Sequence, residues 1–278
     1  MNLTVFHKTV YKYSEAVFLN PHHLYFTPQQ RQYLKCGKHH LEIDPVPDGS
    51  SMRVDAEGNQ YIQAWWNDMT GHLEITLEAE IETQPFNPYQ FFVESAPAQS
   101  DPALEVYLKA VSGVSPALLK WSEQLSSAHT PGLPLILAIT QEIHEKWEYS
   151  SRHEIGIMEV NHCFESRSGS CRDLSWLMIV VLRQLGIPAR FVSGYTFSPE
   201  SGQDHELHAW VEAWLPGGGW ISADPSLGLL ADESYVPIVS SYDPARTHPV
   251  QGIYAGSATS SMSYEVRVEQ TSAYPLPI

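Results

Sequence analysis

The hydrophobic residues of this chain change their spacing part-way along it, and that change limits the fold more than any other feature. Residues 73–82 alternate strictly between apolar side chains and mostly acidic ones, which is typical of a strand with one buried and one solvated face. Asp55–Asn59 has the composition of a hairpin turn. Residues 1–86 are therefore predicted to form a small β-sandwich domain. Three further segments are strand candidates: Leu3–Tyr13, Leu41–Ile43 and Tyr61–Trp66.

From about residue 100 the spacing becomes helical. Ser115-Pro116 is a helix start, with a capping side chain and a first-turn proline. Ile136, Ile139 and Ile143 fall on one face at helical spacing. A longer apolar run, Leu174–Leu185, predicts a buried helix that ends at Gly186.

Strands follow that buried helix. The candidates are Ala189–Tyr195, Leu207–Leu215 and Trp220–Ala223, and Pro216–Gly219 joins the last two as a hairpin. A length of 278 residues suits two domains. Residues 87–278 are therefore predicted to form a second domain, with helices first and an antiparallel sheet after them, so that the fold class is α+β.

Charge and cysteine usage narrow the class of protein. The formal net charge is −16 with only 16 basic residues, which argues against nucleic-acid binding because such proteins cluster Lys and Arg against phosphates. No window approaches the roughly 18 uninterrupted apolar residues of a membrane span, and the N-terminus does not resemble a signal peptide. Three cysteines are too few for a disulfide framework. We expect a cytoplasmic protein without a membrane partner.

Cys171 is the candidate nucleophile. It follows Gly169-Ser170 at the start of the buried helix, where unpaired N–H groups and the helix dipole favour a thiolate. His208 lies in one predicted strand and Asp224 at the far end of its neighbour, and adjacent strands are about 4.8 Å apart. The pattern predicts that His208 acts as general base and acid, that Asp224 orients it, and that the backbone N–H of Cys171 is an oxyanion donor.

Structural interpretations compete with this one. A cysteine in an apolar helix is usually a small buried side chain, Asp173 is explained as a favourable charge in the first helical turn, and Asp224 before Pro225 could be an ordinary turn residue. The chain could then be a non-catalytic module that binds peptides or proteins. Cys163 is a rival nucleophile, but no helix start lies at that position.

A metallohydrolase using Asp204, His205 and His208 is a further alternative. The two histidines are three residues apart rather than four, in a segment patterned as a strand, where they would face opposite sides. Cys36 with His39 and His40 lacks a second pair of ligands at zinc spacing. We therefore expect neither a metal nor an organic cofactor.

The motifs around Cys171 resemble the bacterial transglutaminase-like superfamily, and the spacing between them matches as well. Residues 1–85 resemble the β-rich N-terminal domain that accompanies this core in bacteria. The motifs are Gly169–Leu174, Leu185–Tyr195, His208–Glu212, Gly219-Trp220 and Asp224-Pro225.

The resemblance implies a papain-like transglutaminase core with Cys171 as nucleophile, His208 as base and acid, and Asp224 as the orienting carboxylate. Ser170 and Leu174 replace residues that are often larger or aromatic in the family, which would change the shape of the pocket and leave the chemistry intact. The expected substrate is a peptide, a protein or a small amide. Water would resolve the thioester in an amidase or protease, and an amine would resolve it in transamidation.

Overall fold

The computed structural model describes residues 1–92, 94, 101–152, 156–197 and 207–271. The N-terminal part is built from strands β1 (Asn2–Leu19), β2 (His22–Leu24), β3 (Leu34–Asp44), β4 (Gly49–Val54), β5 (Gln60–Trp65) and β6 (Met69–Thr83). The helices that follow are α1 (Pro116–Ala128), α2 (Leu133–Lys146), α3 (Val160–Ser166) and α4 (Cys171–Gln184). The later strands of the core are β9 (Ala189–Thr196), β10 (His208–Leu215), β11 (Gly219–Asp224), β12 (Leu229–Leu230) and β13 (Tyr235–Ser241).

The alternating segment forms strand β6, as predicted. Its apolar side chains from Leu73 to Ile81 are buried, and the side chains between them are more exposed. β6 pairs with β1 and β3 in one antiparallel sheet, and β2, β4 and β5 belong to a second. Apolar residues of both sheets share one hydrophobic cluster, which is the arrangement expected of two packed sheets. The predicted turn at Asp55–Asn59 joins β4 to β5.

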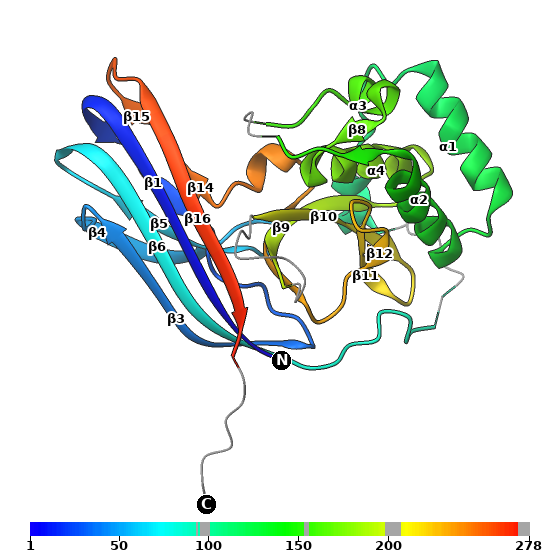
Figure 1. The fold of residues 1–278 in the computed structure, drawn as a ribbon, viewed down its shortest axis with the longest axis horizontal. Helices are drawn as coiled ribbons and strands as arrows, with labels where there is room; N and C mark the ends of the chain where they lie inside the picture. The colour runs from blue at the N-terminus through cyan, green and yellow to red at the C-terminus, as the bar shows by residue number, and fades with distance from the viewer. Residues whose placement is uncertain (93, 95–100, 153–155, 198–206, 272–278) are drawn as a thin grey trace, which may run out of the picture.

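The end of the chain returns to these N-terminal sheets. Strand β16 (Ser260–Gln270) pairs antiparallel with β1 along most of its length, from Leu3 opposite Gln270 to Tyr13 opposite Ser260, and the two strands lie side by side (Figure 1). Two shorter strands, β14 (Val250–Gln251) and β15 (Tyr254–Ala255), also pair with β2 and β1. The division into 1–86 and 87–278 stays a prediction, and it did not anticipate this return.

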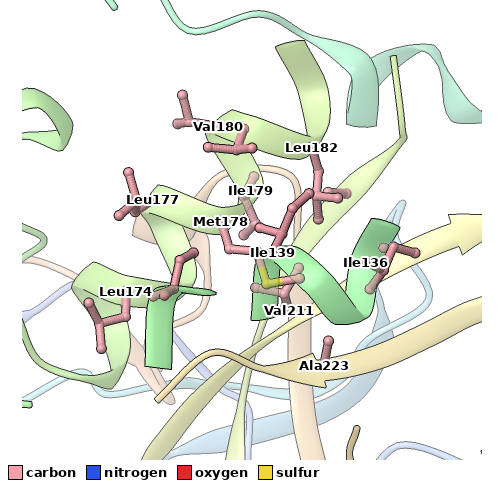
Figure 2. Packing of buried hydrophobic residues seen from close by; sticks show 14 of the residues in the cluster. Ile136, Ile139, Leu174, Leu177, Met178, Ile179, Val180, Leu182, Val211 and Ala223 are labelled. Atoms are coloured by element: carbon pink, nitrogen blue, oxygen red, sulfur yellow. The ribbon is translucent and has the colours of Figure 1, made fainter. Parts of the chain in front are cut away.

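The second part contains a five-stranded antiparallel sheet in the order β12-β11-β10-β9-β13. Helix α4 packs against β10 with nearly all of its side chains buried. Figure 2 shows apolar side chains of α4 meeting Ile136 and Ile139 of α2 and Val211 of β10. The continuous apolar run in the sequence arises because helices and sheet surround α4. The predicted α+β class is confirmed, with N-terminal sheets followed by helices and an antiparallel sheet.

The opposite face of this sheet is covered by the N-terminal part. Tyr195 of β9 and Val236 of β13 belong to the same hydrophobic cluster as residues of β1 and β6. A buried ion network crosses the same interface: Glu212 accepts from Arg31 Nη2 and from Arg190 Nε, both over 2.7 Å. The sheet is therefore buried on both faces, and its polar Glu212 is paired. Among the described residues, no helix is both long and apolar enough to span a membrane.

Candidate active site

Cys171 occupies the first position of helix α4, directly after the N-cap residue Ser170. Its side chain lies at the edge of the core and its residue is 7% exposed. The first N–H groups of a helix have no acceptor within the helix, and the positive end of the helix dipole favours an anion there. Cys171 therefore sits where a thiolate and a developing oxyanion would both be stabilised.

Asp173 holds the start of this helix in place. Its Oδ2 accepts from the backbone N–H and the Oγ of Ser170, over 2.9 and 2.7 Å, and from Arg152 Nε over 2.9 Å. Its Oδ1 accepts from the backbone N–H of Met158 over 2.7 Å. Burial acts to raise the pKa of Asp173, but the hydrogen bonds from Arg152, Met158 and Ser170 lower it. Asp173 is thus more than a favourable charge near the helix dipole, because it ties a separate segment to the nucleophile's helix.

Alanine in place of Asp173 is expected to lower the free energy of unfolding by about 3 kcal/mol, because a buried acceptor of several hydrogen bonds is lost. Urea denaturation of the purified variant measures the effect. Asp101→Ala is the matched control: Asp101 caps the short 3-10 helix Pro102–Leu108 through the backbone N–H of Ala103, at an exposed site, so its loss should cost about 1 kcal/mol or less. Equal effects of the two substitutions would contradict the role given to Asp173.

His208 and Asp224 lie on adjacent strands, as the hairpin pattern predicted. His208 begins β10 and Asp224 ends β11, and Nε2 of His208 donates to Oδ2 of Asp224 over 2.6 Å. The residue Asp224 is 0% exposed, and its other oxygen, Oδ1, accepts from the N–H and the Oγ of Ser226 and from the N–H of Leu227. Burial acts to raise the pKa of Asp224, but the charge of His208 and the side-chain hydrogen bonds from His208 and Ser226 lower it. Asp224 is therefore an ionised acceptor.

The same histidine lies close enough to Cys171 for the thiol to influence its charge. Because Nε2 is taken by Asp224, Nδ1 is the ring nitrogen left for the thiol. Burial acts to lower the pKa of His208, but the charge and hydrogen bond of Asp224, with a further contribution from Cys171, raise it to about 10. The ring is thus positively charged at neutral pH. An imidazolium between a carboxylate and a thiol can support a thiolate and later give a proton to a leaving group.

Gly194 leaves room for other residues to pack next to His208. It lies opposite His208 in the β9–β10 pair, and a Cβ at this position would lie 2.2 Å from the carbonyl oxygen of Val236 and 2.7 Å from the ring of Trp210. Only glycine allows β13 and Trp210 to approach this closely. The glycine of the motif is therefore explained by packing directly behind the candidate site.

The structure also brings Tyr235 to the site. Its O–H donates to Oδ2 of Asp224 over 2.8 Å. Sequence analysis did not select Tyr235, because it reaches the site through the pairing of β13 with β9. Ser226 was likewise missed, although its position two residues after Asp224 is a common place for a side chain that caps a turn.

The rival nucleophile Cys163 lies inside the short helix α3, for which the sequence analysis predicted no element. It is 1% exposed, and burial and then the nearby charge of Asp173 raise the pKa of its thiol to about 12. Burial also raises the pKa of Cys36 in β3. Neither environment favours a thiolate.

The alternative metal site falls partly outside the described residues, because it needs Asp204 and His205. His39, one of the histidines near Cys36, is hydrogen bonded to the carbonyl oxygen of Phe26 over 3.2 Å. Within the described ranges, no three His, Cys, Asp or Glu side chains are grouped so that they could hold a metal ion.

Comparisons with known proteins match both parts of the chain. Residues 120–225 match the core of the transglutaminase-like superfamily, and residues 3–82 match the bacterial transglutaminase-like N-terminal region. An uncharacterized protein of Mycobacterium tuberculosis is 28% identical over 295 aligned positions, which cover 95% of this chain and 91% of that protein. A protein-glutamine gamma-glutamyltransferase of Pseudomonas aeruginosa is 36% identical over 115 residues, which cover 38% of this chain and 17% of that protein.

A solved structure from Cytophaga hutchinsonii, described as that of a candidate cysteine protease, is similar over the full length. The match covers 100% of this chain and 94% of that chain, with a TM-score of 0.74 and 22% identity. At this identity the likeness shows the fold alone. The resemblance noted from the motifs is therefore confirmed: this chain has a transglutaminase-like core preceded by a bacterial transglutaminase-like N-terminal region.

Proposed function

We propose that this protein is a cysteine-dependent amide-bond hydrolase or acyltransferase that works through a thioester at Cys171. The observation that carries the proposal is the position of His208: its ring is hydrogen bonded to the buried carboxylate of Asp224, and Cys171 contributes, after Asp224, to its raised pKa. The substrates we propose are peptides, proteins or small amides. The name of the relative from Pseudomonas aeruginosa supports an acyl donor of the glutamine type.

The first half of the reaction forms the thioester. The thiolate of Cys171 attacks the amide carbonyl carbon, and the oxyanion that develops lies near the N–H groups at the start of α4. The tetrahedral species then collapses, the C–N bond breaks, and the imidazolium of His208 gives its proton to the departing amine. Asp224 supports the charge of His208 before this transfer and keeps the ring in place after it.

The second half breaks the thioester. His208, now neutral, removes a proton from water or from an acceptor amine, which attacks the thioester carbonyl. Collapse of this second tetrahedral species breaks the C–S bond, and the thiolate and imidazolium are restored. Water as acceptor gives an acid, whereas an amine gives a new amide. The same three side chains serve both outcomes.

Trapping the thioester tests the proposal. Glutamine-containing peptides and small amides are incubated with the protein while ammonia or amine release is followed, and the mixture is acid-quenched for intact-mass and peptide mass spectrometry. We expect an acyl adduct on the peptide that contains Cys171, and hydroxamate formation when hydroxylamine is added. A zinc chelator should leave the rate unchanged. Turnover without an adduct, or turnover lost to the chelator and restored by zinc, would favour the metallohydrolase and contradict the proposal.

A further inference from the structure

Two side chains from different strands share one oxygen of Asp224. Oδ2 accepts from Nε2 of His208 over 2.6 Å and from the phenol O–H of Tyr235 over 2.8 Å. Tyr235 is 2% exposed, so its contact is with the protein interior and not with a substrate. We propose that Tyr235 is a positioning residue, which holds Oδ2 of Asp224 in line with the ring of His208. The inference rests on the proposed function, in which His208 serves Cys171.

The other donors to Asp224 cannot do this. All three of them reach Oδ1 and come from Ser226 and Leu227, two and three residues after Asp224 in its own loop. They move together with Asp224 and therefore do not fix it relative to His208. Tyr235 comes from β13, which is separated from β11 in the sheet by β10 and β9. Its hydrogen bond ties the end of β11 to a distant strand and thereby sets where Oδ2 lies.

The ring of Tyr235 is itself held firmly. It meets Trp210 edge to face with centroids 5.2 Å apart, and Trp210 stacks on His208 at 6.2 Å. The backbone carbonyl of Tyr235 accepts from the phenol O–H of Tyr33, over 3.0 Å, across the contact with the N-terminal part. Such packing keeps an outer hydrogen-bond donor in one orientation. The N-terminal part thus supports the residue that supports Asp224.

Burial and the charges around Tyr235 keep its phenol protonated, so that it can donate a hydrogen bond to Asp224. Burial, followed by the charge of Asp224, raises the pKa of Tyr235, and Asp232 and Tyr33 act in the same direction. The phenol therefore keeps its proton over the pH range in which the protein is studied. With Tyr235 and His208 both donating to Oδ2, neutral His208 carries its proton on Nε2 and directs the lone pair of Nδ1 to Cys171.

Tyr235→Phe tests the inference. The charge-assisted bond between His208 and Asp224 should weaken, so the pH midpoint of the His208 ring, followed by NMR with ¹⁵N-labelled histidine, should fall by about one unit. For an amide substrate we expect kcat to fall about tenfold with KM unchanged, because Tyr235 is too buried to touch the substrate. An unchanged or higher His208 midpoint would overturn the inference.

Tyr195→Phe is the matched control. Its phenol is equally buried, at 0% exposure, but it is hydrogen bonded to His7 in the N-terminal part over 2.9 Å. Its removal should lower the melting temperature without moving the His208 midpoint or kcat. The NMR titration needs no substrate, so the two proposals can fail separately. A shifted midpoint in a protein without turnover would defeat only the proposed function, whereas Cys171-dependent turnover with an unshifted midpoint would defeat only the role of Tyr235.

Discussion

Replacing Cys171 with alanine is expected to lower the turnover of amide substrates by about 10⁴-fold or more, because the nucleophile and its covalent intermediate are lost together. The fold should persist, because the substitution removes only the sulfur atom of Cys171 from the first turn of α4, at the edge of the core. We expect the free energy of unfolding to change by about 1 kcal/mol or less. Ammonia release from the peptide panel measures the first effect and urea denaturation measures the second.

Cys163→Ala is the control for this experiment. Cys163 is as small and as buried as Cys171, but burial raises the pKa of its thiol to about 12. The folded Cys163→Ala variant should keep its turnover within about twofold of that of the wild type, since Cys163 has no role beside His208 and Asp224 in the proposed mechanism. Loss of turnover in folded Cys163→Ala, with turnover kept in Cys171→Ala, would reverse the assignment of the nucleophile.

Alanine in place of Glu212 is expected to destabilise the protein by about 3–5 kcal/mol, the usual cost of removing one partner from a buried ion pair. Glu212 is 1% exposed and binds Arg190 of the core sheet and Arg31 of the N-terminal part. Without it, Arg190 keeps a buried charge and the two parts of the chain lose their ionic connection. Urea denaturation at neutral pH gives the difference in free energy of unfolding.

The effect of Glu212 should also depend on pH. Burial acts to raise its pKa, but the charges and hydrogen bonds of Arg190 and Arg31 lower it from 4.5 to about 2. A carboxylate with a lowered pKa stabilises the folded state above its ordinary pKa, and this contribution is lost as the pH falls through the folded value. The gap between wild type and Glu212→Gln should therefore narrow as the pH falls from 4.5 toward about 2.

An exposed ion pair offers the comparison for Glu212. Lys38 and Glu80 lie 3.1 Å apart with side chains 84% and 55% exposed, and exposed pairs contribute about 0–1 kcal/mol. Glu80→Ala should therefore leave the free energy of unfolding nearly unchanged. If Glu212→Ala were equally mild, the buried network would not be what joins the N-terminal part to the core sheet.

The parts of the fold that could be predicted from the sequence carry their own local signals. Strand β6 alternates because one face is core and the other is solvated, and α1 begins at Pro116 because Ser115 caps it through the N–H of Leu118. Helix α4 could be recognised from its unbroken apolar run and from Gly186 after its end, which adopts a positive φ of 74°. In each case the sequence pattern that indicates the strand or helix lies in or directly beside that strand or helix.

The parts that were missed depend on distant residues. Strand β16 was missed although Met262, Tyr264, Val266 and Val268 alternate with polar residues, and of these four only Val266 and Val268 are buried. Its pairing with β1 joins opposite ends of the chain, which no local pattern reports. Helix α3 was missed because its cap is a glutamate, Glu159, whose side chain accepts from the N–H of His162, and glutamate is not a usual N-cap residue.

The candidate site likewise has residues that local sequence patterns predicted and residues that they did not. The hairpin between β10 and β11 predicted that His208 and Asp224 would lie close together, and the structure places their side chains 2.6 Å apart. The additional donors to Asp224 could not be predicted equally well: Ser226 lies in the adjacent turn, whereas Tyr235 depends on where β13 joins the sheet. The catalytic roles of Cys171, His208 and Asp224 stay predictions until they are tested in solution.

The rate of iodoacetamide alkylation at each cysteine as a function of pH, followed by peptide mass spectrometry, shows whether His208 activates Cys171. Cys36 and Cys163 serve as internal controls, because burial raises the pKa of both. We expect Cys171 to react quickly well below pH 7 and His208→Ala to abolish this advantage, since an imidazolium supports the thiolate. If Cys171 in the folded protein is unreactive, or titrates as an ordinary thiol near pH 8.5, the proposed activation by His208 is wrong and a non-catalytic binding module becomes the better explanation.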